Sequence, residues 1–169
     1  MSVEAFKTRV LPVKDKLYRF AVRLLKDDEE AKDVVQEAMI RVWNRRDQMS
    51  TLQNMEAWCM TVVRNLSLDR LKSKKYKTDG FAEGFEVSEN GRTPYAETEI
   101  NNTMNVIHNF IAALPEKQKQ IIQLRDIEGY SYKEIGDILG LDANNVKVNL
   151  FRARKAVREN LLNTHAYGL

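Results

Sequence analysis

The stretch 131-SYKEIGDILGLDANNVKVNLFRAR-154 decides the fold of the C-terminal part of the chain. Its first apolar side chains recur at the spacing of one helical face: Tyr132, Ile135, Ile138 and Leu139. Ser131 is suited to cap that helix, with Glu134 three residues later. Gly140 fits the position after a helix, where a positive φ is needed, and Asp142 can cap a second helix. The stretch therefore predicts two helices joined by a tight turn, a helix-turn-helix.

The second of these helices separates apolar from polar groups when its residues are plotted at about 100° each. An arc about 80° wide, which we expect to face the core, holds Val146, Leu150, Ala153, Val157 and Leu161. The opposite side gathers Asn144, Val148, Phe151, Arg152 and Lys155, with Lys147 and Asn149 on the flanks. Amides can pair with adenine, apolar groups can meet a thymine methyl, and cations can reach guanine or phosphate. The pattern favours a DNA-reading helix, and an ordinary solvated face stays open as the alternative.

Helical periodicity continues through most of the remaining chain, and no strand pattern competes with it. Two apolar stripes precede residue 45: Val13, Leu17, Phe20, Ala21 and Leu24, then Ala31, Val34, Val35, Ala38, Met39, Val42 and Trp43. A third helix is predicted over about Met55 to Lys75. The C-terminal part predicts helices near 99–113, 115–128, 131–139 and 143–161. The predicted fold class is all-α.

A stretch without apolar periodicity separates the two helical parts. It is rich in Gly, Ser, Thr, Asn and Pro, and such a long unstructured segment is unusual within one compact domain. Residues 76–100 hold 2 Lys/Arg against 6 Asp/Glu, whereas residues 1–75 hold 16 against 11 and residues 101–169 hold 9 against 7. We therefore predict two small helical domains, 1–75 and 99–169, joined by a flexible acidic linker, 76–98.

Composition excludes several classes of protein. The 169 residues are 43% hydrophobic and 30% charged, as in a globular helical protein, and no apolar run is long enough to span a membrane. No signal peptide is expected, and the single cysteine, Cys59, suits a reducing cytoplasm, where we expect it to be a buried apolar side chain. His108 and His165 stand apart from other metal-ligand residues, so no metal or cofactor is predicted.

The segment from Leu114 to Val157 resembles region 4 of bacterial RNA polymerase sigma factors of the sigma-70 family, in the small extracytoplasmic-function (ECF) group. The matching elements are Leu114-Pro115-Glu116-Lys117-Gln118, Glu128-Gly129-Tyr130-Ser131, Glu134-Ile135, Val146-Lys147 and Arg152-Ala153-Arg154. Residues 33–47 resemble region 2.2, and residues 57–75 resemble regions 2.3 and 2.4. Two matches in the family's order make the resemblance more specific than the helix-turn-helix alone.

The resemblance implies three binding surfaces. A surface for a coiled coil of the largest catalytic polymerase subunit would comprise Asp33, Gln36, Glu37, Ile40 and Arg41, although a solvated face would also account for these residues. A surface for the −10 promoter element would comprise Thr61, Arg64, Asn65, Lys72 and Lys75, with the loop at about 48–56. There a non-template base would be flipped into a protein pocket. Trp58 could stack on a base, but its place on the apolar arc favours the core.

A third surface, for the −35 element, would comprise Ser131, Lys133, Asn144, Asn145, Lys147, Val148, Asn149, Phe151 and Arg152. Three residues depart from the family pattern. Asn149 stands where many members have Arg or Ser, Asn145 where Thr or Ser is usual, and Gly136 where Ala is common. Gly136 costs about 1 kcal/mol relative to Ala within a helix, which a close approach of two helices would explain.

The resemblance implies a non-enzymatic transcription initiation factor in the cytoplasm. Its partners would be core RNA polymerase and promoter DNA, with an anti-sigma factor as inhibitor and with no small-molecule substrate or membrane insertion. The main alternative is a stand-alone helix-turn-helix regulator that binds operator DNA without polymerase. An enzyme is disfavoured because no phosphate loop, metal cluster or nucleophile–base motif is present. A purely structural helical protein would make the double match accidental.

Overall fold

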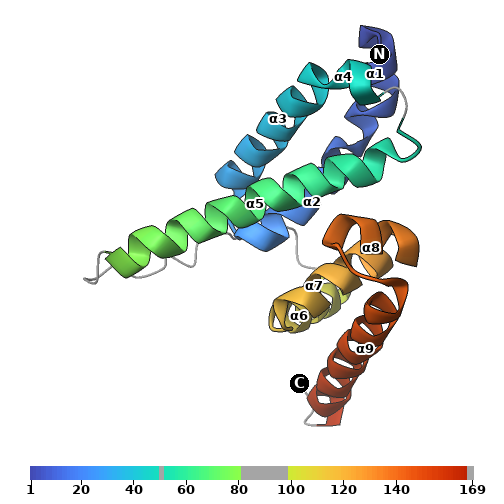
Figure 1. The fold of residues 1–169 in the computed structure, drawn as a ribbon. Coiled ribbons are helices and arrows are strands. Elements are labelled where there is room, and N and C mark those ends of the chain that lie inside the picture. The colour runs from blue at the N-terminus through green and yellow to red at the C-terminus, as the bar shows by residue number, and fades with distance from the viewer. Residues whose placement is uncertain (50–51, 81–98, 167–169) are drawn as a thin grey trace. The chain divides into compact units, whose positions relative to one another are not determined.

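The computed structural model describes residues 1–49, 52–80 and 99–166, and within them every regular element is helical. The prediction of an all-α fold is confirmed. The chain divides into two compact units, Met1–Arg92 and Thr93–Leu169 (Figure 1). Of the predicted linker, residues 81–98 lie outside the described residues, while residues 76–80 continue the last helix of the N-terminal unit.

The N-terminal unit is built on a bundle of three long helices: α2 (Lys14–Leu25), α3 (Asp28–Asn44) and α5 (Met55–Gly80). Each packs against the other two (Figure 1). The fully buried side chains of this bundle include Leu17, Phe20, Val34, Val42, Met60 and Val63. Leu17, Phe20, Val34 and Val42 belong to the two apolar stripes that the sequence predicted, since a helix in a bundle buries one face.

Local chemistry sets the short connection between α2 and α3. Lys26 follows α2 in the left-handed region, with φ of 54°, and its N–H donates to the Val22 carbonyl. Asp27 then caps α3 by accepting a hydrogen bond from the Glu30 N–H at 3.1 Å. The first turn of α3 is acidic, and its negative charges interact favourably with the positive end of the helix dipole.

Three short elements were not predicted: α1 (Val3–Arg9), η1 (Leu11–Val13) and α4 (Arg46–Met49). The Phe6 ring of α1 meets Trp43 edge to face, with centroids 5.2 Å apart, and the Arg46 guanidinium lies 4.3 Å from the Trp43 centroid. Met39 and Trp43 are partly exposed, whereas the other members of the predicted stripe on α3 are buried: Ala31, Val34, Val35, Ala38 and Val42.

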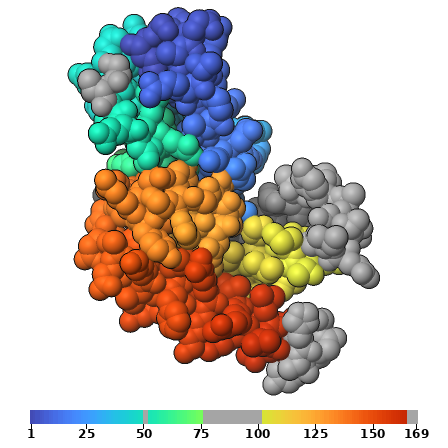
Figure 2. Space-filling model, turned by 90° about the vertical axis from the view of Figure 1, so that its right-hand side faces the viewer, coloured from blue at the N-terminus to red at the C-terminus, as the bar shows by residue number. Residues whose placement is uncertain are grey.

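The C-terminal unit consists of α6 (Glu99–Ala112), α7 (Glu116–Ile122), η2 (Gln123–Ile127), α8 (Tyr132–Leu139) and α9 (Ala143–Ala166). In the space-filling view, α7 to α9 form one closely packed surface from orange to red (Figure 2). The core of the C-terminal unit includes apolar side chains that are at most 2% exposed: Ile121, Leu124, Ile135, Ile138, Val146 and Ala153. Helix α9 runs past residue 161, the end that the sequence predicted.

The helix predicted near 115–128 is present, but its second half is π-helical, not α-helical. After Ile122 the backbone widens into a π-helical turn, in which the Glu128 N–H donates to the Gln123 carbonyl at 3.0 Å. Gly129 follows with φ of 79°, and the Tyr130 N–H returns to the Leu124 carbonyl at 3.0 Å. A π-turn inserts one extra residue per turn, and simple helical periodicity does not reveal it.

Candidate nucleic-acid and polymerase interfaces

The helix-turn-helix is fixed by the local interactions that its sequence predicted. The Ser131 hydroxyl accepts from the Glu134 N–H at 3.1 Å, and the Asp142 carboxylate accepts from the Asn145 N–H at 2.7 Å. Gly140 ends α8 in the left-handed region, with φ of 68°. These contacts cap both helices and define the turn between them.

Gly136 allows the turn to fold back onto α8. The Leu141 N–H donates to the Gly136 carbonyl at 2.9 Å. A Cβ atom at Gly136 would lie 2.6 Å from the Leu141 carbonyl oxygen, a distance that real Cβ atoms do not show. A close approach is therefore present at this glycine, but it is to the backbone of the turn and not to a second helix, as the sequence had suggested.

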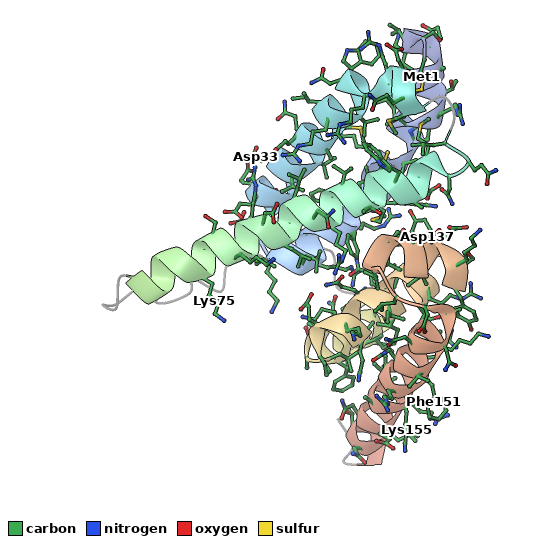
Figure 3. All side chains as sticks on the ribbon, in the orientation of Figure 1. Met1, Asp33, Lys75, Asp137, Phe151 and Lys155 are labelled. Carbon is green, nitrogen blue, oxygen red and sulfur yellow. The ribbon has the colours of Figure 1, made fainter. Side chains whose placement is uncertain are left out.

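Helix α9 buries the predicted apolar arc almost completely. Val146, Leu150, Ala153 and Val157 are at most 8% exposed, and Leu161 is partly exposed near the end of the helix. The predicted outer face is exposed, with Val148 at 40% and Phe151 at 66%. Figure 3 shows Phe151 and Lys155 pointing away from α6 and α7. Burial of one arc thus fixes the rotation of α9 and leaves the other for a partner.

Four more residues of the predicted −35 surface are exposed to solvent: Lys133, Asn144, Lys147 and Arg152. Ser131 and Asn145 are half-buried and take part in the caps described above. Lys147 lies with its Nζ 5.6 Å from the centroid of the Tyr132 ring, and the Arg125 guanidinium lies 4.7 Å from that centroid. Tyr132 and Arg125 were not among the predicted site residues, because this cluster joins three separate elements.

Asn149, which was predicted on the flank of the reading face, is largely buried there. It is only 9% exposed, and its Nδ2 donates to two oxygens of Asn145, the backbone carbonyl at 2.9 Å and Oδ1 at 2.5 Å. Asn149 was predicted on the flank of the reading face, yet its donor group is committed to the preceding turn of α9. The helical plot places a residue around the axis but does not show which polar neighbour its side chain selects.

The predicted polymerase surface lies along one side of α3. Gln36, Ile40 and Arg41 are exposed, with Ile40 at 54%, and Asp33 is exposed as well (Figure 3). Glu37 is half-buried and pairs with Arg41, their charged atoms 2.7 Å apart. All five residues therefore share one accessible face of α3.

Arg70 of α5 links this face to the neighbouring helix. Its guanidinium lies 3.6 Å from the Glu37 carboxylate and 3.9 Å from that of Asp33. Arg70 was not assigned to the surface from the sequence, since its partners lie more than thirty residues away. It therefore lies within ion-pair distance of two acidic side chains of α3.

The predicted −10 surface on α5 is accessible, although its members differ in exposure. Asn65, Lys72 and Lys75 are exposed, while Thr61 and Arg64 are half-buried. The Thr61 hydroxyl donates to the Ala57 carbonyl at 2.9 Å. The Asn54 side chain caps α5 by accepting from the Ala57 N–H, and residues 50–51 of the preceding loop lie outside the described residues.

A pocket of about 220 Å³ opens between α3 and α5 at this surface. Its lining mixes cations, amide, hydroxyl and apolar groups: Arg41, Arg45, Trp58, Thr61, Val62 and Asn65. Trp58, which the sequence favoured as a core residue, is only half-buried and lines this pocket. Arg45 was not predicted at all. Aromatic, amide and guanidinium groups together can stack on and hydrogen-bond a base.

Cys59 and His108 are two further residues that the sequence singled out as candidates for chemistry. Cys59 is fully buried, as expected, and its burial, followed by the nearby Glu56 charge, raises the pKa of its thiol to about 12. In the described part of the chain, no group of three or more His, Cys, Asp or Glu side chains could hold a metal ion. His108 lines a groove of about 350 Å³ among α6, η2 and α9, and that groove is mostly apolar.

Comparison with known proteins agrees with both units. Residues 10–76 match the family model for sigma-70 region 2, and residues 104–157 match the model for sigma-70 region 4. Among curated relatives, the ECF RNA polymerase sigma factor SigW of Bacillus subtilis is 32% identical over 94% of this chain and 89% of its own length. The ECF RNA polymerase sigma factor SigL of Mycobacterium tuberculosis is 30% identical over 84% of this chain and 80% of its own.

A solved structure gives the same result. The sigma factor RpoE of Bartonella quintana, in complex with the anti-sigma factor NepR, matches with a TM-score of 0.75 and 25% identity over 94% of this chain and 98% of that one. Among the described residues, no helix is long and apolar enough to cross a membrane. The chain belongs to the ECF group of the sigma-70 family and is a transcription initiation factor that binds core RNA polymerase and directs it to promoters.

Proposed function

We propose that the two units divide promoter recognition between them. Residues 99–169 read the −35 element through α9, and residues 1–75 bind core polymerase through α3 and the −10 element through α5, with residues 76–98 as the linker. The observation that carries the proposal is the division of α9 into a buried arc and an exposed face that bears Val148, Phe151 and Arg152. That face matches the requirements of the major groove, which accepts a helix and is read by amide, apolar and cationic groups.

On α3, Gln36 and Glu37 are the central contacts to polymerase, with Asp33, Ile40 and Arg41 around them. An exposed Ile40 among charged groups suits an interface that combines apolar burial with polar pairing. The Glu37–Arg41 pair and Arg70 support the proposal because they hold the surface in one arrangement before polymerase binds. Less side-chain entropy is then lost on binding.

At the −10 element, the pocket lined by Trp58, Thr61 and Asn65 receives an unstacked base of the non-template strand. Arg41 and Arg45 at its edge neutralise phosphates. Lys72 and Lys75, exposed further along α5, extend the positive surface along the DNA. Unstacking costs a few kcal/mol, which stacking and pocket contacts offset.

The chain carries out no chemistry of its own and acts in the cytoplasm, where polymerase supplies catalysis. An anti-sigma factor is its proposed inhibitor, supported by the similar RpoE structure, which was solved in complex with one. The similar proteins SigW, SigL and RpoE, all named as sigma factors, support this proposal.

Run-off transcription tests the proposal. Purified core polymerase is assayed over a promoter library with and without the chain, and initiation at specific promoters should appear only when the chain is added. Gln36→Ala with Glu37→Ala should weaken polymerase binding without unfolding the bundle. Lys147→Ala with Arg152→Ala should instead reduce −35-dependent initiation, and the loss relative to the native chain should be larger at low salt than at high salt. Tight, promoter-specific binding by the free chain that polymerase does not improve would instead support a stand-alone regulator.

A further inference from the structure

Asn145 and Asn149 form a side-chain pair whose donor and acceptor atoms are fixed by chemistry. The Asn149 atom that lies 2.9 Å from the Asn145 backbone carbonyl must be Nδ2, because a carbonyl oxygen only accepts. The same Nδ2 lies 2.5 Å from the end of the Asn145 side chain. That end must therefore be Oδ1, since two amide nitrogens would repel each other.

This pairing decides what Asn145 offers to a partner. Its Oδ1 is occupied by Asn149, and among the described residues no hydrogen-bond partner faces its Nδ2. The two N–H groups of Nδ2 are donors only. Asn145 is the third residue of α9, one turn before Asn149, and residues at this end of a recognition helix contact base edges.

The positions around α9 fit this division of roles. At about 100° per residue, Asn145 lies about 60° from the exposed Val148, at the border of the outer face. Asn149 lies about 100° from Val148 on the same side, turned towards the core, and is only 9% exposed. Asn145 is therefore the member that can reach DNA, and Asn149 lies behind it.

We propose that Asn149 is a positioning residue that locks Asn145 as a hydrogen-bond donor in the −35 major groove. The proposal rests on the proposed reading of the −35 element by α9. The locked amide favours a base edge that presents an acceptor, such as guanine O6, a purine N7 or thymine O4, and it disfavours the cytosine N4 amino group. An unlocked Asn would rotate its amide and accept either kind of edge.

The test uses run-off transcription by core polymerase with the full chain over promoters with a constant −10 element and a randomised −35 element. With the native chain, one −35 position should show about tenfold discrimination against cytosine. Asn145→Ala and Asn149→Ala should each reduce discrimination at that position to about twofold or less and leave the other positions unchanged. The double variant should match Asn145→Ala.

Asn149→Asp is a more direct test than Asn149→Ala, because it should reverse the base preference and not only reduce it. A carboxylate cannot donate, so it should turn the Asn145 amide around, expose Oδ1 to the DNA and shift the preference towards cytosine. Circular dichroism checks folding, and if Asn149→Asp loses helicity, Asn149→Ala decides. If the Asn149 variants lower transcription from all −35 sequences equally, Asn149 has only a structural role and the proposal is overturned. A native chain without any −35 preference would overturn the proposed function as well.

Discussion

The guanidinium of Arg154 in α9 is joined to the Asp126 carboxylate of η2 by two hydrogen bonds, of 2.9 and 2.5 Å. Hydrogen bonding to Asp126 raises the pKa of the Arg154 guanidinium. The two residues are 28 positions apart, and their pairing ties the recognition helix to the π-helical turn.

Asp126→Asn should weaken this link only modestly. Arg154 and Asp126 are 51% and 35% exposed, so solvent screening limits the loss to about 0.5–1 kcal/mol. Thermal unfolding should show a decrease in Tm of a few degrees, smaller at high salt. Asp137→Asn on the exposed side of α8 is the matched control and should have no effect (Figure 3). Equal changes in both variants would contradict a specific role for the pair.

Leu150 and Phe151 are neighbours on opposite faces of α9, 2% and 66% exposed. Leu150→Ala leaves a cavity in the core and should cost about 2–5 kcal/mol of unfolding free energy. Phe151→Ala should change that free energy by less than about 0.5 kcal/mol but reduce −35-dependent transcription. Chemical denaturation and run-off transcription of both variants give the comparison. A large stability loss in Phe151→Ala would mean that its ring is part of the core.

Arg70→Ala should release Asp33 and Glu37 on α3. Because these ion pairs are partly exposed, we expect core polymerase affinity to decrease about two- to fivefold, with a stability loss of about 1 kcal/mol or less. Competition binding to core polymerase measures the effect. Lys7→Ala removes an exposed ion pair with Glu4 on α1, where no polymerase contact is proposed, and serves as the control. The prediction fails if Lys7→Ala weakens binding as much as Arg70→Ala.

The substitution Gly136→Ala should have two opposite effects on the stability of the fold. Alanine favours the helix by about 1 kcal/mol, but its Cβ would meet the Leu141 carbonyl oxygen at 2.6 Å, and that backbone atom can move only with the turn. Overpacking of this kind costs about 1–3 kcal/mol, so a lower Tm and weaker −35 recognition are expected. Asp137→Ala, at the next position, is the control, because it introduces alanine into the same helix without the contact to the Leu141 carbonyl oxygen. A higher Tm for Gly136→Ala would show that the turn adjusts freely.

Because of Cys59, the free energy of unfolding should depend on pH in the alkaline range. Its pKa is about 12 in the folded chain, against an ordinary value of 9.0, so the unfolded chain loses the thiol proton first. The stabilising contribution of the neutral buried thiol is complete below pH 9 and decreases as the pH rises towards 12. Denaturation at several pH values should show a steeper alkaline loss for the native chain than for Cys59→Ala. Parallel curves would contradict this.

The accessibility of Cys59 gives an independent measurement. A thiol that is fully buried and protonated should react with an alkylating reagent at pH 8 only when the bundle opens. The rate should therefore increase with denaturant in step with unfolding. Rapid modification of the folded chain would show that Cys59 is exposed.

Much of the fold could be read from the sequence because its determinants are local. Ser131, Gly140 and Asp142 act within four residues of the groups they cap, and the arc from Val146 to Val157 repeats at the helical period. The exposed face of α9 is then the side opposite this buried arc. The same reasoning placed Gln36, Ile40 and Arg41 on the exposed side of α3.

Only the tertiary structure decided how side chains from distant positions combine. It joined Arg70 to α3, brought Arg45 and Trp58 to one pocket, and widened the backbone after Ile122 into a π-turn. Within α9, Asn149 contacts Asn145 four residues earlier, a choice of partner that periodicity does not show. The sequence by itself determined which faces are apolar, because burial depends on periodicity. The choice of polar partners depends on distances of a few ångströms, which exist only after the helices have packed.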